Sequence, residues 1–352
     1  MSDARPLRVV QVGLGDWGRD WAWRVIPEVK RVDLVGYVDT DPAALKLVAK
    51  EVKASAKHCF ESLPAAIEAT RPDAALVTAT LPAHVPIARS ALEAGLHVLV
   101  EKPFAPTLAL ALDLVNLAAA KQRILMVSQN YRFFPAPRAV ATLLRESPLG
   151  PLHEISIDFR RWSRSSGQGP LRQHREEQPL LVDMSIHHFD LLRFLLGQEP
   201  QRVYCEAWNP GWSAFSGPSA ATASIVFDGV VVGYRGSWLS TGPITSWAGE
   251  WRMEFEGGQV FWTSRDDNGA LADRVVVTPR GGKPKTITLA RMPHVDRWGT
   301  LTEFADAVQA DREPACSGRD NLGTIAFVAA AVASATQHEP VVPESVEASL
   351  VM

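Results

Sequence analysis

The segment Gly13–Gly18 reads GLGDWG and matches the pattern GxGxxG. It directly follows Leu7–Val12, a β-branched run typical of a buried strand. In a dinucleotide-binding loop, Gly13 makes the tight turn, Gly15 lets the backbone approach a pyrophosphate, and Gly18 lets the next helix pack closely. The N–H groups at the helix N-terminus then face the phosphates. A glycine-rich turn alone is common, but in this context it predicts a dinucleotide site.

Asp39 follows Gly18 by 21 residues and ends the next apolar run, Asp33–Val38. A carboxylate at this place accepts hydrogen bonds from the ribose hydroxyls and repels a 2′-phosphate. The following Thr40 and Asp41 supply no cation, so the sequence favours NAD over NADP. An acidic turn after a glycine-rich connection is the alternative interpretation. Asp16 and Trp17 also lie inside the loop, and Asp16 brings a negative charge toward the pyrophosphate.

Lys102 belongs to the tripeptide Glu101-Lys102-Pro103, which follows the apolar run His97–Val100. Ligands of open α/β sheets bind at the carboxyl ends of the strands. A lysine there binds a substrate hydroxyl or takes part in proton transfer when its surroundings lower its pKa. A solvated charge pair at a strand end is the alternative.

Asp183, His187 and Asp190 are spaced so that they share one face of a helix. A carboxylate one turn from a histidine can orient the imidazole, and such a histidine can relay a proton near pH 7. A structural face of caps and ion pairs is one alternative. A zinc site that includes His188 is another, but adjacent histidines point apart on a helix, so no metal is expected.

Gln129–Phe133 (QNYRF) is a polar and aromatic segment after the last expected strand of the first domain. Pockets form preferentially at domain junctions, which makes this segment a candidate pocket wall. Packing between domains is the alternative.

The elements that must carry these residues alternate at first. The expected strands are Leu7–Val12, Asp33–Val38, Ala74–Thr78, His97–Val100 and Ile124–Ser128, and the expected helices are Trp17–Ile26, 42–52, His84–Ala94 and Thr107–Lys121. This order is typical of a doubly wound parallel sheet. After Ser128, half-polar strands such as His153–Trp162 indicate a largely antiparallel sheet. The predicted class is α/β, with a Rossmann domain at 1–128 and an α+β domain with an open sheet at 129–352.

The composition excludes several classes of protein. The 352 residues carry 36 lysines and arginines against 39 acids, so no net basic field attracts a nucleic acid. Three widely spaced cysteines indicate neither a disulfide framework nor a cysteine-based zinc site. The N-terminus lacks signal-peptide features, and the apolar stretch Leu322–Thr336 is too short to span a bilayer. We therefore expect a cytoplasmic chain with no membrane or nucleic-acid partner.

An arginine-rich segment, Arg160–Arg175, contains no acidic residue. It predicts either a mobile loop that receives an anionic or phosphorylated substrate, or an exposed basic loop.

With these segments in order, the chain resembles the glucose–fructose oxidoreductase, inositol dehydrogenase and MocA family of NAD(P)-dependent oxidoreductases. The resemblance covers nearly the whole chain. It rests on GLGDWG, Asp39, Thr80–Pro103, Gln129–Arg138 and Val182–Gly197.

The resemblance implies roles for individual residues. Lys102 is the catalytic or substrate-binding lysine, Asp183 and His187 are its partners, and His187 is the usual acid or base. Tyr131 and Arg132 are assigned with them to the substrate pocket. The cofactor is implied to contact Thr80, Pro82, His84, Glu101, Lys102 and Asn130. The resemblance also implies a cis Lys102–Pro103 bond and an open sheet that builds homodimers or homotetramers.

Together these features predict an enzyme that transfers a hydride between NAD and a secondary alcohol or ketone of a sugar, polyol or sugar derivative. The nicotinamide carries the redox chemistry, and the protein supplies alignment and electrostatics. Spacing leaves open whether Lys102 or His187 is the base, because coupled neighbours titrate together. Two other functions remain: a non-catalytic sensor of dinucleotide and sugar, and an oxidoreductase of an aromatic-derived substrate.

Overall fold

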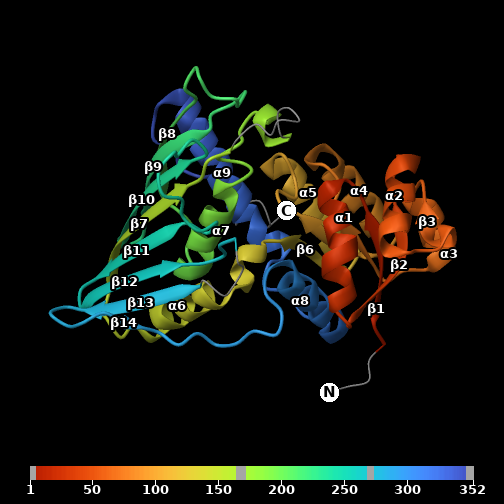
Figure 1. Cartoon of the computed structure of the whole chain (residues 1–352), viewed down its shortest axis with the longest axis horizontal. Helices are drawn as coiled ribbons and strands as arrows, with labels where there is room; N and C mark the ends of the chain where they lie inside the picture. The colour runs from red at the N-terminus through yellow and green to blue at the C-terminus, as the bar shows by residue number, and fades with distance from the viewer. Residues whose placement is uncertain (1–4, 164–171, 268–272, 346–352) are drawn as a thin grey trace. The chain divides into compact units, whose positions relative to one another are not determined.

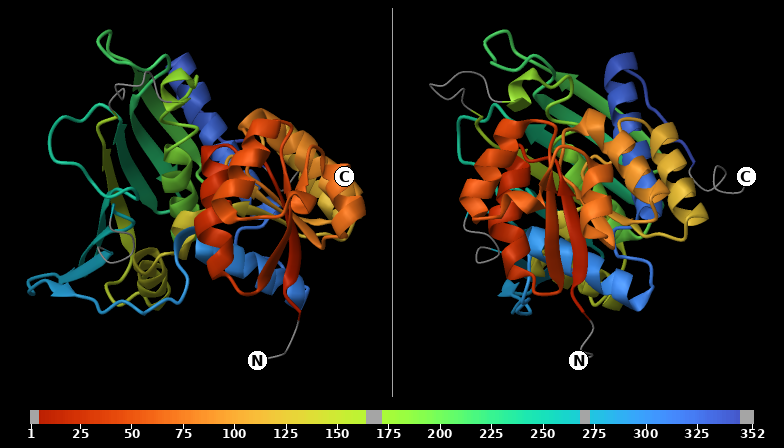
Figure 2. Two further views of the ribbon diagram at one scale, coloured as in Figure 1. Left: turned by 45° about the vertical axis from the view of Figure 1, so that its right-hand side comes forward. Right: turned by 90° about the vertical axis from the view of Figure 1, so that its right-hand side faces the viewer.

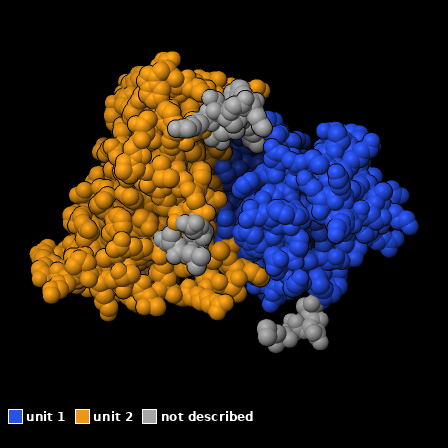
Figure 3. Space-filling view, viewed as in Figure 1, with its two compact units in different colours: residues 1–130, 296–322, 349–352 blue, residues 131–295, 323–348 orange. Residues whose placement is uncertain are grey.

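The computed structural model describes residues 5–163, 172–267 and 273–345 (Figure 1). Its described residues form two compact units (Figure 3). Unit 1 comprises residues 5–130 and 296–322, and unit 2 comprises the described residues of 131–295 and 323–345. Contacts thus group 296–322 with the first unit, although this segment lies well beyond residue 128.

Unit 1 is built on a parallel sheet of six described strands in the order β3-β2-β1-β4-β5-β6. Helices flank this sheet on both faces (Figure 2). The strands are β1 (Leu7–Val12), β2 (Val32–Val38), β3 (Cys59–Phe60), β4 (Ala74–Val77), β5 (His97–Glu101) and β6 (Leu125–Ser128). The helices are α1 (Asp16–Asp20), α2 (Pro42–Val52), α3 (Leu63–Thr70), α4 (Leu81–Glu93), α5 (Leu108–Ala120) and α8 (Asp296–Ala310). The strands β4 and β6 are buried throughout, which explains their continuous apolar sequences. The predicted Rossmann sheet is confirmed.

The local sequence explains where α2 begins. The Asp41 side chain accepts a hydrogen bond from the Ala43 N–H at 2.8 Å, and Pro42 occupies the first turn of α2, as expected. In place of the expected single helix Trp17–Ile26, three helical segments follow one another: α1, a π-helical turn Trp21–Val25 and a 3₁₀ turn Ile26–Glu28. The short β3 and α3 were not predicted. In β3, two residues are too few to show an alternation of apolar and polar side chains.

Unit 2 contains a sheet of eight described strands in the order β14-β13-β12-β11-β7-β10-β9-β8. Only the β7–β10 pair among these is parallel, so the predicted, largely antiparallel sheet is confirmed. The strands are β7 (Leu152–Arg160), β8 (Arg202–Trp208), β9 (Ala220–Phe227), β10 (Val230–Ser237), β11 (Glu250–Phe255), β12 (Gly258–Thr263), β13 (Arg274–Pro279) and β14 (Lys285–Thr286). The helices are α6 (Pro135–Glu146), α7 (Ser185–Leu196) and α9 (Gly318–Gln337), and the boundary between the units falls within α9.

One face of the unit 2 sheet is apolar and forms the core. Along β7, Ile155, Ile157 and Phe159 are buried, whereas the residues between them are more exposed. The same alternation runs through β10 and β11. A period of two therefore separates a buried face from a polar face that carries ion pairs such as Arg160–Glu250 and Arg235–Asp158.

The helix expected to carry Asp183 begins later than its spacing suggested. The helix α7 begins at Ser185, and the preceding residues form a turn in which the Ser185 N–H donates to the Leu180 carbonyl at 2.7 Å. This bond spans five residues and interrupts the four-residue repeat of an α-helix. The i, i+4 relationship of Asp183 and His187 on one helix was therefore wrong, and only His187 and Asp190 lie on α7.

None of the helices in the described ranges is both long and apolar enough to cross a membrane.

Candidate functional site

The glycine-rich loop of unit 1 leaves space where a pyrophosphate would lie. Gly13 has a φ of +98°, and a Cβ there would lie 2.3 Å from the Ala79 nitrogen. A Cβ at Gly18 would lie 2.0 Å from the Gly13 carbonyl oxygen, which explains why this helix position is glycine. A Cβ at Gly15 would meet no atom within 4 Å. Of the three glycines in this loop, Gly15 alone faces open space, which leaves room for a phosphate group.

A buried polar network holds this loop. The Gln11 amide donates to the Gly18 carbonyl at 2.6 Å and to the Thr78 hydroxyl at 3.0 Å. The Thr78 hydroxyl in turn donates to the Gly13 carbonyl at 2.6 Å. Buried polar groups are tolerated when they are hydrogen-bonded, and here they fix both ends of the loop. Sequence reasoning missed Gln11 and Thr78, although polar residues in apolar strands were a readable signal.

Asp39 lies at the carboxyl end of β2, against the glycine-rich loop. Its Oδ2 accepts from the Leu14 N–H at 2.7 Å, and its Oδ1 accepts from the Asp41 N–H at 2.9 Å. Each carboxylate oxygen has a second lone pair, which leaves acceptors for ribose hydroxyls. Asp16 is exposed over 96% of its side chain and forms an ion pair with Arg19, so water and a cation screen its charge.

Glu101 is buried, and two indoles share one of its oxygens. Trp17 and Trp21 donate their Nε1–H groups to Oε1 of Glu101 at 2.8 and 2.7 Å. The guanidinium of Arg297, from α8, lies 4.1 Å from the centre of the Trp17 ring and bonds to Asp20. The structure therefore joins the expected cofactor contacts Trp17 and Glu101. Nothing in the sequence near them pointed to Arg297, which lies far along the chain.

The segment that carries Lys102 is fastened by a histidine. The Lys102–Pro103 bond is cis, as the resemblance implied. On α4, His84 places Nδ1 2.8 Å from the Pro103 carbonyl oxygen and Nε2 2.9 Å from that of Ala79. A neutral imidazole donates to one of these oxygens, and an imidazolium donates to both. His84 thus ties the end of β5 to the end of β4.

The remaining expected cofactor contacts in unit 1 occupy element ends. Thr80 precedes α4 as its N-cap residue, and Pro82 lies in the first turn of this helix. Asn130 follows β6 and donates its side-chain amide to the carboxylate of Asp296, the first residue of α8.

In unit 2, His187 and Tyr131 form a face-to-face pair. Their ring centres are 4.0 Å apart and their planes differ by 3°. Both side chains are buried, with 6% and 3% of their surface exposed. Stacking over this area restricts the rotation of both rings, so the imidazole plane is set by the phenol.

Arg132 and Asp190 form a buried ion pair in the same unit. Arg132 donates from Nε and Nη2 to the two carboxylate oxygens at 2.6 Å each, and the Thr324 hydroxyl donates to Oδ1 at 3.1 Å. This two-pronged geometry is the strongest that arginine makes with a carboxylate. The pair therefore fastens α7, which carries Asp190, to the segment before α6.

His188 is distinct from its neighbour in both environment and chemistry. Burial lowers its pKa to about 4, although the backbone carbonyl of Trp247 opposes the shift. That carbonyl accepts from Nε2 at 3.0 Å, so Nε2 carries the proton of the neutral ring. Nδ1 then accepts from the Tyr234 hydroxyl at 3.1 Å, and Tyr234 accepts from Ser185 at 2.8 Å. His188 is a neutral structural residue.

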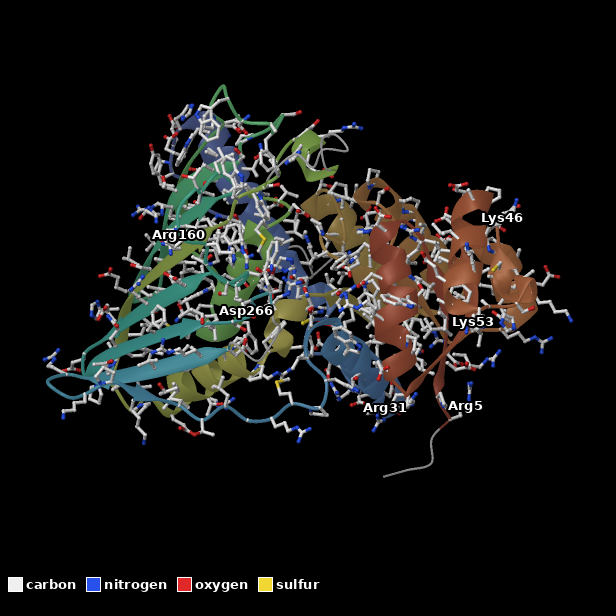
Figure 4. All side chains as sticks on the ribbon, in the orientation of Figure 1. Arg5, Arg31, Lys46, Lys53, Arg160 and Asp266 are labelled. Atoms are coloured by element: carbon white, nitrogen blue, oxygen red, sulfur yellow. The ribbon has the colours of Figure 1, made fainter. Side chains whose placement is uncertain are left out.

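Only part of the arginine-rich segment can be placed, because residues 164–171 lie outside the described ranges. At its start lies Arg160, which is labelled in Figure 4. Arg160 forms ion pairs with Asp158 and Glu250 on the polar face of the sheet. The guanidinium of Arg161 lies 4.2 Å from the centre of the Trp247 ring and donates a hydrogen bond to the Asp267 carboxylate at 3.0 Å. Partial desolvation raises the pKa of Asp267, but Trp247 and Arg161 outweigh it and lower this pKa overall.

Two family models match the chain. The oxidoreductase family with an NAD-binding Rossmann fold matches residues 7–129, and the GFO/IDH/MocA C-terminal domain matches residues 138–260.

Named relatives match most of the chain. A D-apiose dehydrogenase from Paraburkholderia graminis is 26% identical over 351 residues, which cover 96% of this chain and 90% of the relative. An inositol 2-dehydrogenase from Rhizobium meliloti is also 26% identical and covers 86% of this chain and 89% of its own.

Solved structures share the fold. An oxidoreductase from Agrobacterium radiobacter, in complex with NAD⁺, L-tartaric acid and magnesium, has a TM-score of 0.83 at 21% identity and covers 97% of this chain and 99% of its own. The aldose-aldose oxidoreductase from Caulobacter crescentus has the same TM-score and identity, with 96% and 100% covered. The loop geometry, the strand-end acid and both family models agree, and the chain belongs to the Gfo/Idh/MocA family of NAD-binding oxidoreductases.

Proposed function

We propose that this oxidoreductase is an NAD-dependent dehydrogenase of a secondary alcohol in a sugar, a polyol or a sugar derivative. The family supports the reaction class, and relatives that span most of the chain carry the names D-apiose dehydrogenase and inositol 2-dehydrogenase. The observation that carries the proposal is the buried imidazole of His187, held flat against Tyr131 in the family's C-terminal domain.

The residues of unit 1 fit a dinucleotide. Gly15 offers the open approach for the pyrophosphate, and the carboxylate of Asp39 offers acceptors for the ribose hydroxyls. Asp39 also favours NAD over NADP, because a 2′-phosphate would lie against its charge. We assign Gly13, Gly18, Asp16, Trp17, Thr80, Pro82, His84, Glu101 and Asn130 to the surroundings of the same cofactor. Bound NAD supplies the carbon that accepts the hydride.

The protein's own contribution is to bind the alcohol and move its hydroxyl proton. We propose that His187 accepts this proton, that Lys102 donates a hydrogen bond to the same oxygen, and that Asp183 orients the two. A neutral imidazole is the form that accepts a proton, and histidine changes charge near neutral pH. Tyr131 would then form one wall of the substrate pocket.

We propose a supporting role for Arg132. Its guanidinium donates two hydrogen bonds to Asp190, so in this proposal Arg132 holds Tyr131 and α7 in place and does not itself bind substrate.

We also propose that the chain forms a homodimer or homotetramer through the open sheet of unit 2, as its family membership implies.

The test combines cofactor binding with turnover. Fluorescence titration should show tighter binding of NADH than of NADPH, and the reverse would overturn the choice of cofactor. A panel of alcohols that includes myo-inositol and D-apiose should show NAD-dependent oxidation. In Lys102→Ala and His187→Ala, turnover should fall at least about a hundredfold, as expected when a proton-transfer group is lost. Turnover that both variants retain would overturn the site, and tight NADH binding without turnover of any alcohol would favour a sensor.

A further inference from the structure

His187 is the end of a longer stack of side chains in unit 2. Beyond Tyr131, the guanidinium of Arg265 lies 4.7 Å from the centre of the Tyr131 ring. The same guanidinium lies 5.6 Å from the centre of the Trp247 ring. The contacts therefore run in the order His187, Tyr131, Arg265 and Trp247, and they join residues far apart in the sequence.

Arg265 contacts Tyr131 through both a cation–π interaction and a hydrogen bond. Its charge lies over the ring, and its Nη1 donates to the Tyr131 hydroxyl at 3.0 Å. A cation over an aromatic face is attracted by the ring quadrupole, and a hydrogen bond from a charged donor is stronger than a neutral one. The hydrogen bond fixes the far end of the Tyr131 ring, and the charge holds its face.

The backbone of Arg265 is built to place this side chain. Its φ is +54°, a left-handed conformation that is uncommon for a long side chain. The surroundings hold it there: the Arg265 N–H donates to Asp273 at 3.0 Å, and the Arg265 carbonyl accepts from the Trp247 N–H at 2.8 Å. Asp273 also accepts from the Ala136 N–H at 2.9 Å, which links the residue to the start of α6. Such over-determined backbone conformations concentrate at functional sites.

We propose that Arg265 is a positioning residue for the proton-transfer histidine: through Tyr131 it sets the plane of the His187 imidazole. The inference rests on the proposed function, in which His187 takes the hydroxyl proton. Arg265 holds the Tyr131 ring, and the centre of this ring lies 4.0 Å from that of the parallel His187 imidazole. The imidazole therefore cannot tilt without moving the phenol. A base must point its nitrogen at the proton it removes, and a tilted ring loses that alignment.

The first test reads the orientation of His187 without any substrate. The protein is labelled with ¹³C at the histidine Cε1, and the His187 signal, one of nine, is assigned with His187→Gln. The Tyr131 ring current should shift the His187 proton upfield. In Arg265→Leu this signal should move toward that of exposed His58, and in Arg265→Lys, which keeps the charge, it should move less. An unchanged His187 signal in Arg265→Leu would overturn the inference.

The second test reads the reaction, with the alcohol of the panel that the enzyme oxidises best. Arg265→Leu should lower kcat about tenfold while KM for NAD stays unchanged, and Arg265→Lys should recover most of kcat. Arg280→Leu, which removes an exposed arginine in the turn after β13, is the matched control and should retain kcat. Equal loss of kcat in Arg265→Leu and Arg280→Leu would overturn the inference. If no alcohol is oxidised while the His187 signal still moves, the proposed function fails and the positioning contact stands.

Discussion

Asp39 binds the backbone of Leu14, so the acid that ends β2 also shapes the glycine-rich loop after β1. The Leu14 N–H donates to Oδ2 at 2.7 Å, within the segment between Gly13 and Gly15. One carboxylate thus performs two tasks, because it orders the loop and presents acceptors beside it. Removing the charge should therefore weaken NADH binding more than loss of a single ribose contact would.

We expect Asp39→Ser to bind NADH about ten- to a hundredfold more weakly and to lose its preference over NADPH. Hydrogen bonds to charged groups contribute about 1.5–3 kcal/mol, and each 1.4 kcal/mol is about tenfold in affinity. Fluorescence titration with both nucleotides measures the change. Asp33→Asn, on the same strand and paired only loosely with Arg8 at 3.7 Å, is the control that should bind NADH normally. If Asp39→Ser kept the wild-type ratio of NADH to NADPH affinity, Asp39 would not contact the ribose.

Gly15 and Gly18 of the loop should respond differently to the same added methyl group. At Gly15 the new Cβ enters open space, so Gly15→Ala should keep the wild-type Tm and bind NADH at least about tenfold more weakly. At Gly18 the Cβ would lie 2.0 Å from the Gly13 carbonyl oxygen, so Gly18→Ala should lower the Tm. Thermal unfolding and NADH titration of both variants separate the two effects. A Gly15→Ala protein with unaltered NADH affinity would show that the pyrophosphate lies elsewhere.

Much of the fold of unit 1 could be predicted from the sequence, because its sequence patterns are local. The glycine pattern, the apolar strands and the Asp41–Pro42 helix start each depend on a few neighbouring residues. Contacts between distant residues were not readable. Arg297 reaches Trp17 across 280 positions of sequence, and Arg265 reaches Tyr131 across 134. No periodicity reports such pairs, since they depend on how the elements pack.

The error at Asp183 has a different origin. The apolar and polar residues of 180–190 continue a helical pattern, but the Ser185 N–H bonds five residues back and the helix begins there. Periodicity describes which residues are buried, and a tight turn can bury the same ones. The pairing of Asp190 was likewise decided by Arg132, a residue 58 positions earlier.

The ion pair of Arg132 and Asp190 should be costly to break on one side only. Both side chains are at least 95% buried, so Arg132→Met leaves a buried carboxylate without its cation. We expect a loss of about 3–5 kcal/mol in the free energy of unfolding, measured by urea denaturation. The double variant Arg132→Met, Asp190→Leu should recover a large part of this loss, because both charges are then absent. Additive losses in the double variant would show that the two residues act independently.

The buried His188 should make the protein less stable as the pH falls through the range from about 6.5 to about 4. Its pKa is about 4 when folded, against a usual value of 6.5, so in this range the unfolded chain binds a proton that the folded protein does not. Stability therefore rises with pH across this range: the penalty from His188 is fully developed below about pH 4 and absent above about pH 6.5. The full shift corresponds to on the order of 3 kcal/mol.

Urea unfolding of wild type and His188→Gln at pH 4.5, 5.5, 6.5 and 7.5 measures this contribution. The variant should be less stable at pH 7.5, because the hydrogen bonds to Tyr234 and Trp247 are altered, but its stability should depend less steeply on pH. Subtracting the two curves removes the contribution of the carboxyl groups, which both proteins share. His58→Gln, which replaces an exposed histidine, should reproduce the wild-type slope. If His188→Gln also had the wild-type slope, folding would not lower the pKa of His188, and burial would not keep its imidazole neutral in this pH range.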